Sequence, residues 1–130
     1  MGELTVSLVA VDRKIWTGVA KMVVAKTVEG EMGIMPAHEP VLAILADGTV
    51  RVEPLVGDKL VFAVHGGFFS VDNDRVTVLA EAAEAAADID VPRAEAALER
   101  AKAAGLDSPE EIAAARRAET RLRVASTHTR

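Results

Sequence analysis

The distribution of valine and alanine divides this chain into two parts. Sixteen of the eighteen valines in the 130-residue sequence lie at or before Val78, and alanine dominates after that point. Valine favours strands because its branched side chain fits a pleated surface, whereas alanine is the strongest helix former. The sequence therefore predicts a β-domain in residues 1–86 and a helical part in residues 87–130.

The first part reads as a series of short strands. Leu4, Val6, Leu8 and Ala10 alternate with other side chains, and this period of two predicts a strand with one apolar face. Gly, Asp and Asn then recur as turn signals, so that we expect further strands near 15–16, 22–28, 41–45, 50–55, 60–64, 68–71 and 76–80. Gly66-Gly67 indicates a bulge or a close backbone approach. Many short strands with frequent turns indicate an antiparallel sandwich or barrel.

The second part contains the start and stop signals of two helices. Asp90 is a predicted N-cap, and Gly105 is the predicted end of the first helix. Ser108 is the predicted N-cap of the second helix, with Pro109 in its first position and Glu111 in a capping box. The connection is short, so we expect an antiparallel hairpin. Its apolar stripe holds few large side chains, so we expect only a few kcal/mol to hold it in place.

Residues 30–40 form an unusual segment, with the sequence Gly-Glu-Met-Gly-Ile-Met-Pro-Ala-His-Glu-Pro. Two glycines and two prolines exclude a helix interior or a central strand. We interpret the segment as a rigid surface connection in which Gly30 and Gly33 bracket a tight turn. It carries Glu31 and His38. The alternative is a plain loop without a binding role.

The pattern G-E-x-G-I-x-P-x-H-x-P in this segment resembles the signature of the epsilon subunit of F-type ATP synthases. The resemblance continues through residues 65–69, 76–81, 88–90, 93–94 and 121–124, and so covers nearly the whole chain. It implies a flattened two-sheet sandwich followed by two antiparallel helices. It also implies a non-catalytic rotor subunit for ATP synthesis and proton transport. The implied partners are the gamma subunit, the c-ring and the alpha and beta subunits, at the cytoplasmic face of the inner membrane, with the chain peripheral to it.

The resemblance also assigns roles to individual residues. Glu31 and His38 match positions that face the polar loops of the c-ring. The alternative for His38 is a hydrogen bond that braces the loop, and the alternative for Glu31 is plain solvation. The resemblance requires no cofactor.

Some members of that family hold ATP on the folded hairpin through a motif similar to I-D-x-x-R-A. The residues that match this ATP-binding set are Glu84, Ile89, Asp90, Arg93, Arg100, Arg117 and Arg121. Arginine forks suit phosphate oxygens, so ATP is an implied regulatory ligand. Ala103-Ala104 departs from the pattern, because ATP-holding members tend to carry arginine or polar residues there. The alternative is that Asp90 only caps the helix and the arginines are solvated.

The last nineteen residues are basic. Residues 112–130 hold five Lys or Arg and one acidic residue, in a chain whose net charge is −5. Such a patch is usually a solvated helix face, but it can also bind an acidic surface. The resemblance implies an inhibitory contact with the catalytic beta subunits through Arg116, Arg117, Arg121 and Arg123.

Several function classes are disfavoured by what the sequence lacks. It has no cysteine, and its three histidines are widely separated, so we expect no thiol nucleophile, no metal site and no catalytic set. No phosphate-binding loop motif occurs, and the net negative charge argues against general nucleic-acid binding. No apolar run reaches the length of a membrane span. The rival interpretations are a stand-alone nucleotide-sensing or peptide-binding module and, less favoured, an enzyme.

Overall fold

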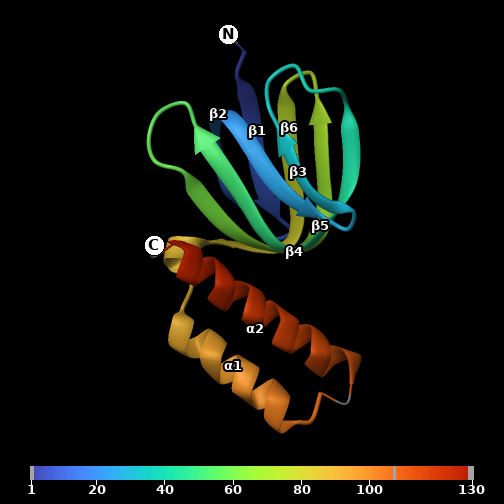
Figure 1. Cartoon of the computed structure of the whole chain (residues 1–130), viewed down its shortest axis with the longest axis vertical. Coiled ribbons are helices and arrows are strands. Elements are labelled where there is room, and N and C mark those ends of the chain that lie inside the picture. Colours follow the sequence, from blue (N-terminus) through green and yellow to red (C-terminus); the bar gives the residue numbers. More distant parts are fainter. Residues whose placement is uncertain (1, 107, 129–130) are drawn as a thin grey trace.

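A computed structural model describes the backbone of residues 2–106 and 108–128, with side chains as far as Ser126. A β-sandwich precedes a pair of antiparallel helices, which confirms the predicted fold (Figure 1). The elements are β1 (Leu4–Ala10), β2 (Arg13–Thr27), β3 (Gly30–Ile34), β4 (Val41–Pro54), β5 (Leu60–Asp72), β6 (Arg75–Ala85), the 3-10 helix η1 (Ala86–Asp88), α1 (Val91–Ala103) and α2 (Pro109–His128).

The six strands form one sheet that closes on itself. Their order is β1-β6-β5-β4-β2-β3, and β1 also pairs with β2, so that five strands make a ring and β3 lies at its edge. The pairs are antiparallel except β1 with β6, which run parallel. The prediction of an antiparallel sandwich is therefore correct apart from this one pair.

Some strands are longer than predicted because two of them, β4 and β5, pass from one layer of the sandwich into the other. In β4 the core-facing positions change from odd to even numbers between Leu45 and Val50, and in β5 they change from even to odd between Val64 and Phe69. The pairing of β4 with β5 is interrupted at the same positions, between the pairs Ile44↔Phe68 and Gly48↔Val64. Such a bend is how a strand turns the corner of a closed sheet. The predicted breaks between strands 41–45 and 50–55, at Asp47-Gly48, and between 60–64 and 68–71, at Gly66-Gly67, are therefore wrong, although the predicted close backbone approach is present.

Gly67 makes the corner possible. Its φ of 112° lies in the region that favours glycine, and a Cβ at this position would overlap the carbonyl oxygen of Leu79 on β6. Directly after this glycine, the side chain of Phe68 faces away from the core and that of Phe69 is fully buried. The glycine pair sets the direction in which every later β5 side chain points.

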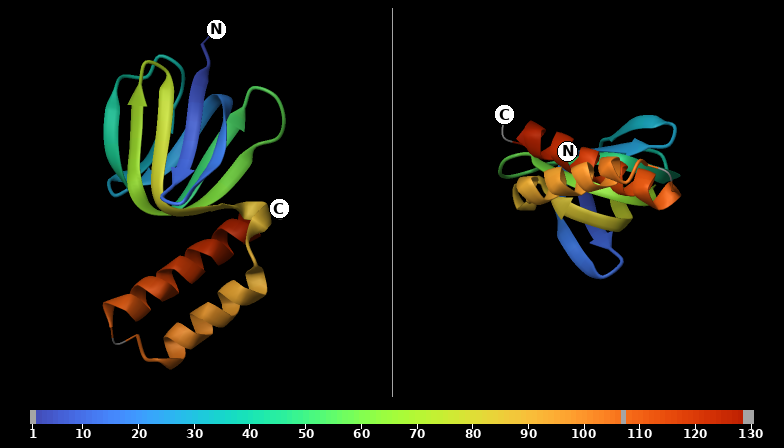
Figure 2. Two further views of the ribbon diagram at one scale, coloured as in Figure 1. Left: turned by 180° about the vertical axis from the view of Figure 1, so that it is seen from behind. Right: turned by 90° about the horizontal axis from the view of Figure 1, so that it is seen from below.

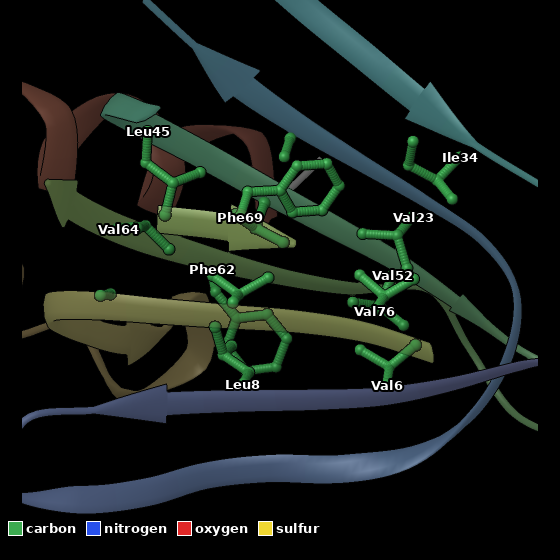
Figure 3. Packing of buried hydrophobic residues seen from close by; sticks show 14 of the residues in the cluster. Val6, Leu8, Val23, Ile34, Leu45, Val52, Phe62, Val64, Phe69 and Val76 are labelled. Atoms are coloured by element: carbon green, nitrogen blue, oxygen red, sulfur yellow. The ribbon is translucent and has the colours of Figure 1, made fainter. Parts of the chain in front are cut away.

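The sandwich encloses the main hydrophobic core, which is built from aliphatic side chains and two phenylalanines (Figure 3). Val23, Val52 and Val76 come from three different strands and are essentially inaccessible to solvent. Phe62 and Phe69 add the largest apolar surfaces. This core is contributed by all six strands, and neither helix adds a residue to it over the part of the chain that the structure describes.

The helical hairpin is capped as predicted. The backbone N–H of Arg93 donates to Asp90 Oδ1 over 3.0 Å, and that of Glu111 donates to Ser108 Oγ over 3.2 Å. Helix α2 lies between the sandwich and α1 (Figure 1), and the two helices run side by side at one end of the sandwich (Figure 2). A small second cluster joins α2 and η1 to β5, and its members are Val61, Ala63, Ala86, Ile89, Val124 and Ala125.

Candidate functional site

Glu31 lies on the edge strand β3, not in a turn. Residues 30–34 pair with β2, and Gly30 has a positive φ whereas Gly33 does not, so the prediction that both bracket one tight turn is wrong. The side chain of Glu31 is 59% exposed, and its Oε1 is 4.0 Å from Arg51 Nη2 on β4. Solvation therefore dominates its surroundings, and it remains free to meet a partner.

His38 lies in the connection between β3 and β4. This connection is at the end of the sandwich away from the helices (Figure 1). Its Nδ1 donates to the carbonyl of Glu39 over 2.7 Å, and its backbone N–H donates to the carbonyl of Met35 over 3.2 Å. The turn is tied to the β5–β6 turn, because the N–H of Ala37 donates to Asp74 Oδ1 over 2.7 Å. His38 thus braces its own turn, whereas Glu31 lies earlier in the chain, on β3.

A cavity of about 410 Å³ lies where β6, α1 and α2 meet. Five of the seven residues predicted to bind ATP line it, together with Asp88, Ala94 and Ala97; the five are Glu84, Asp90, Arg93, Arg100 and Arg121. Arg121 Nε donates to Glu84 Oε1 over 2.6 Å, which ties α2 to the sandwich at the cavity wall. Three guanidinium groups and three carboxylates thus converge on one space. That set suits a ligand with both phosphate oxygens and hydrogen-bond donors.

The other two predicted residues lie elsewhere. Ile89 is buried in the second cluster, where it packs against β5 and α2, and Arg117 is absent from the cavity lining. Asp90 caps α1 through Oδ1 and lines the cavity as well, so the two interpretations of this residue are compatible. The departing pair Ala103-Ala104 lies at the distal end of α1, outside the cavity.

The four arginines predicted to make an inhibitory contact are not equally available. Arg116 and Arg123 are exposed, whereas Arg117 and Arg121 are half-buried. Arg121 is held by Glu84 of the sandwich. In this docked arrangement, α2 does not present its four arginines to one partner. All four become available only if α2 leaves the sandwich.

An apolar row on the outside of the sandwich was not predicted from the sequence. Ile44, Phe68 and Leu79 are register neighbours across β4, β5 and β6, and each is 46–54% exposed. Val9 of β1 continues the row beside Leu79, and Leu42 lies two residues before Ile44 and is 72% exposed. The signal was obscured because the sequence does not reveal where β5 reverses its inward and outward faces. A contiguous apolar surface of this kind is a candidate protein interface.

Other kinds of site find little support in the part of the chain that the structure describes. Its histidines and carboxylates do not gather in any group of three or more suited to a metal ion. Neither helix, over the residues described, is both long and apolar enough to cross a membrane.

Comparison with known proteins identifies the family. Residues 3–86 match the family described as "ATP synthase, Delta/Epsilon chain, beta-sandwich domain". The chain belongs to this family. An ATP synthase epsilon chain from Streptomyces avermitilis is 48% identical over 124 residues, which is 95% of this chain and 96% of that protein. Another, from Rhodococcus erythropolis, is 56% identical over 99 residues, or 75% of this chain and 81% of that protein.

Solved structures agree with this assignment. A chain in the Euglena gracilis mitochondrial ATP synthase structure "OSCP/F1/c-ring in rotational state 1" has a TM-score of 0.73 at 28% identity. The match covers 99% of this chain and 81% of that one. A chain of the Tetrahymena thermophila mitochondrial central stalk and c-ring shares the fold, with a TM-score of 0.59 at 16% identity. Membership of the delta/epsilon family gives the chain the role of a rotor subunit of ATP synthase, in place of a free-standing module.

Proposed function

We propose that this chain is a non-catalytic subunit of the ATP synthase central stalk, that its sandwich joins the gamma subunit to the c-ring, and that its hairpin restrains ATP hydrolysis. The observation that carries this proposal is that the sandwich and the hairpin are held together by separate clusters of buried residues. The sandwich has a complete core of its own, while the hairpin is attached through a small separate cluster. The chain then works at the cytoplasmic face of the membrane, held there by the complex.

The exposed apolar row is the surface that we assign to the gamma subunit. Four register-aligned or adjacent hydrophobic side chains, Leu42, Ile44, Phe68 and Leu79, give a flat face whose burial would stabilise a permanent interface. Phe68→Asp should prevent co-purification with gamma, because a carboxylate would be buried there without a partner. Val11→Asp is the matched control, since Val11 is exposed on the β1–β2 turn outside the row. Equal assembly of both variants would contradict the assignment.

Glu31 and His38 are assigned to the polar loops of the c-ring. The side chain of Glu31 is largely exposed, and His38 is half-buried in a turn braced by hydrogen bonds, which suits it to a defined contact. Glu31→Lys combined with His38→Ala should lower proton-coupled ATP synthesis, while the free energy of unfolding changes by only about 0.5 kcal/mol. Glu99→Lys, on the exposed face of α1, is the control for charge reversal. Full coupling in the double variant would remove these residues from the ring contact.

ATP is the proposed regulatory ligand of the 410 Å³ cavity. Bound there, its phosphates would meet Arg93, Arg100 and Arg121 on both helices, and would therefore stabilise the docked hairpin. At an ATP concentration one hundred times the Kd, binding should stabilise the docked hairpin by about 2.7 kcal/mol. Calorimetric titration with MgATP should give heat for the unmodified chain and for Arg116→Gln, which lies outside the cavity. Arg100→Gln should bind more weakly, and no heat from the unmodified chain would exclude this ligand.

The inhibitory role is assigned to the released hairpin. Each exposed ion pair contributes little by itself, so we expect Arg116, Arg117, Arg121 and Arg123 to act together on an acidic surface of the catalytic beta subunits. A chain ending at Ala87 should still assemble, and its complex should hydrolyse ATP faster. Replacing the four arginines by glutamine should reproduce part of that increase. Unchanged hydrolysis after truncation would show that the hairpin is no brake.

A further inference from the structure

His65 is a buried imidazole without a hydrogen-bond partner. Its residue is 5% exposed, and neither Nδ1 nor Nε2 has a partner in the described structure. It lies on β5 at the strand's corner and lines a cavity of about 310 Å³ on the other side of the Arg121–Glu84 pair from the proposed ATP site. A buried polar group without a partner is costly and calls for an explanation.

Helix α2 provides the cover over His65. Val61, Ala63 and His65 share one face of β5 because side chains in a strand alternate. The first two pack in the second cluster with Val124 and Ala125 of α2. Helix α2 also contacts both β4 and β5. His65 therefore lies at the junction that opens when the hairpin leaves the sandwich.

The charges around His65 are divided between the two sides of this junction. Burial and the guanidinium of Arg121 lower the pKa of His65 below its ordinary value of 6.5, and Arg117 acts in the same direction. Asp47 on β4 and Glu84 on β6 act in the opposite direction. Both arginines belong to α2, whereas both carboxylates belong to the sandwich.

Release of the hairpin would thus remove the three causes that lower the pKa of His65, which are burial, Arg121 and Arg117. The imidazole would regain water, and both arginines would move away with the helix, while Asp47 and Glu84 would stay. The other charged groups of the cavity, Asp12, Arg13 and Glu81, are all on the sandwich and stay beside His65 in both states. Every change on release favours the imidazolium ion.

We propose that His65 is a proton-sensitive latch: protonation of its imidazole favours release of the hairpin from the sandwich. The docked state has the lower pKa of His65, so docking is at its full strength at pH values above the pKa of the released state, where His65 is neutral in both states. That strength is lost progressively as the pH falls from the released-state pKa towards the docked-state pKa. Below both values the docking constant is lower by tenfold for each unit of pKa difference. The proposal rests on the contacts within this chain and is independent of its assembly with other subunits.

A distance measurement on the full-length chain tests the latch. The sequence has no cysteine, so Thr77→Cys on β6 and Ala96→Cys on α1 give two exposed labelling sites, one on each body. Energy transfer between dyes at these sites should fall as the pH is lowered from 7.5 to 5.5 and should recover on return. Resonances of the His65 ring should titrate over the same interval. Constant energy transfer across the interval would overturn the proposal.

Two matched variants separate His65 from general acid effects. His65→Gln has no titrating group at position 65, so its energy transfer should stay constant over that pH range. His38→Gln keeps His65 and should behave like the parent chain. Persistent acid release in His65→Gln would assign the response to other groups and overturn the proposal. If His65→Gln does not fold, the ring titration of the parent chain decides: the latch requires its midpoint to coincide with the change in energy transfer, and separate midpoints contradict it.

Discussion

The core of the sandwich and the docking interface of the hairpin are built in opposite ways. The sandwich core is filled by large side chains from six strands, including Phe69, Leu4 and Leu8, which are fully buried. The docking cluster has six residues, three of them alanine, and His65 beside it is a buried polar group without a partner. Because each buried CH₂ contributes only about 0.8 kcal/mol, the two regions differ greatly in the free energy that holds them together.

This difference explains how one small chain can be both rigid and responsive. A rotor contact needs surfaces that keep their shape, and the closed sheet supplies them. A regulatory element needs an equilibrium that a ligand, a proton or a partner can shift by a few kcal/mol. The alanine-rich cluster and the Arg121–Glu84 pair provide an attachment of that order.

The largest effect should come from the centre of the sandwich. Phe69→Ala removes a fully buried ring and should lower the free energy of unfolding by about 3–5 kcal/mol. Phe68→Ala, at the next position, should cost no more than about 1 kcal/mol because Phe68 is 52% exposed. Urea unfolding of both variants measures the difference. Similar losses would mean that the two faces of β5 are wrongly assigned.

The corner of the sheet should be the next most sensitive point. Gly67→Ala combines backbone strain with overlap against Leu79 and should cost about 2–4 kcal/mol. Gly57→Ala is the control, since Gly57 also has a positive φ but has open space around it. Gly57→Ala should lose less stability, because it introduces backbone strain without a steric overlap. A Gly67→Ala chain as stable as the control would contradict the close approach of β5 and β6.

The sequence predicted what depends on local chemistry. The change from valine to alanine gave the β and α parts, and Asp90 and Ser108 marked the helix starts that their hydrogen bonds confirm. It failed at the corner, where Asp47-Gly48 was interpreted as a strand end. Gly48 lies beside the Lys26 side chain of β2, a neighbour that only the tertiary structure reveals.

The same limit applies to the candidate sites. Family motifs selected five residues that do line one cavity, because their spacing follows two capped helices. The glycines and prolines of residues 30–40 predicted one rigid connection that carries both Glu31 and His38. Glu31 instead lies on β3 and His38 lies after it, since pairing with β2 overrides the local turn signals. The burial of His65 could not be predicted, because it depends on where α2 lies.

Changes in the docking cluster should loosen the hairpin without affecting the sandwich. Val124→Ala removes two buried methyl groups and should lower the free energy of hairpin opening by about 1.5 kcal/mol. Amide exchange in α1 and α2 should become faster, while exchange in β4 and β5 stays unchanged. Equal acceleration in both regions would show that hairpin and sandwich open as one unit.

The smallest effect should come from the ion pair. Arg121→Gln should lower the free energy of hairpin opening by at most about 1 kcal/mol, because the pair is partly exposed to solvent. High salt should reduce the difference between this variant and the parent chain. Arg116→Gln, on the exposed side of α2, should have no effect on opening. Amide exchange in α2 at two salt concentrations checks both statements.

Native-state hydrogen exchange on the full-length chain tests most directly whether the hairpin opens independently of the sandwich. The structure predicts that amides of α1 and α2 exchange through an opening that costs a few kcal/mol less than the opening that exposes β4, β5 and β6. The helical amides should form one cooperative group, with the same dependence of exchange on denaturant. A single opening free energy shared by helices and strands would contradict the view of a detachable hairpin on a self-sufficient sandwich.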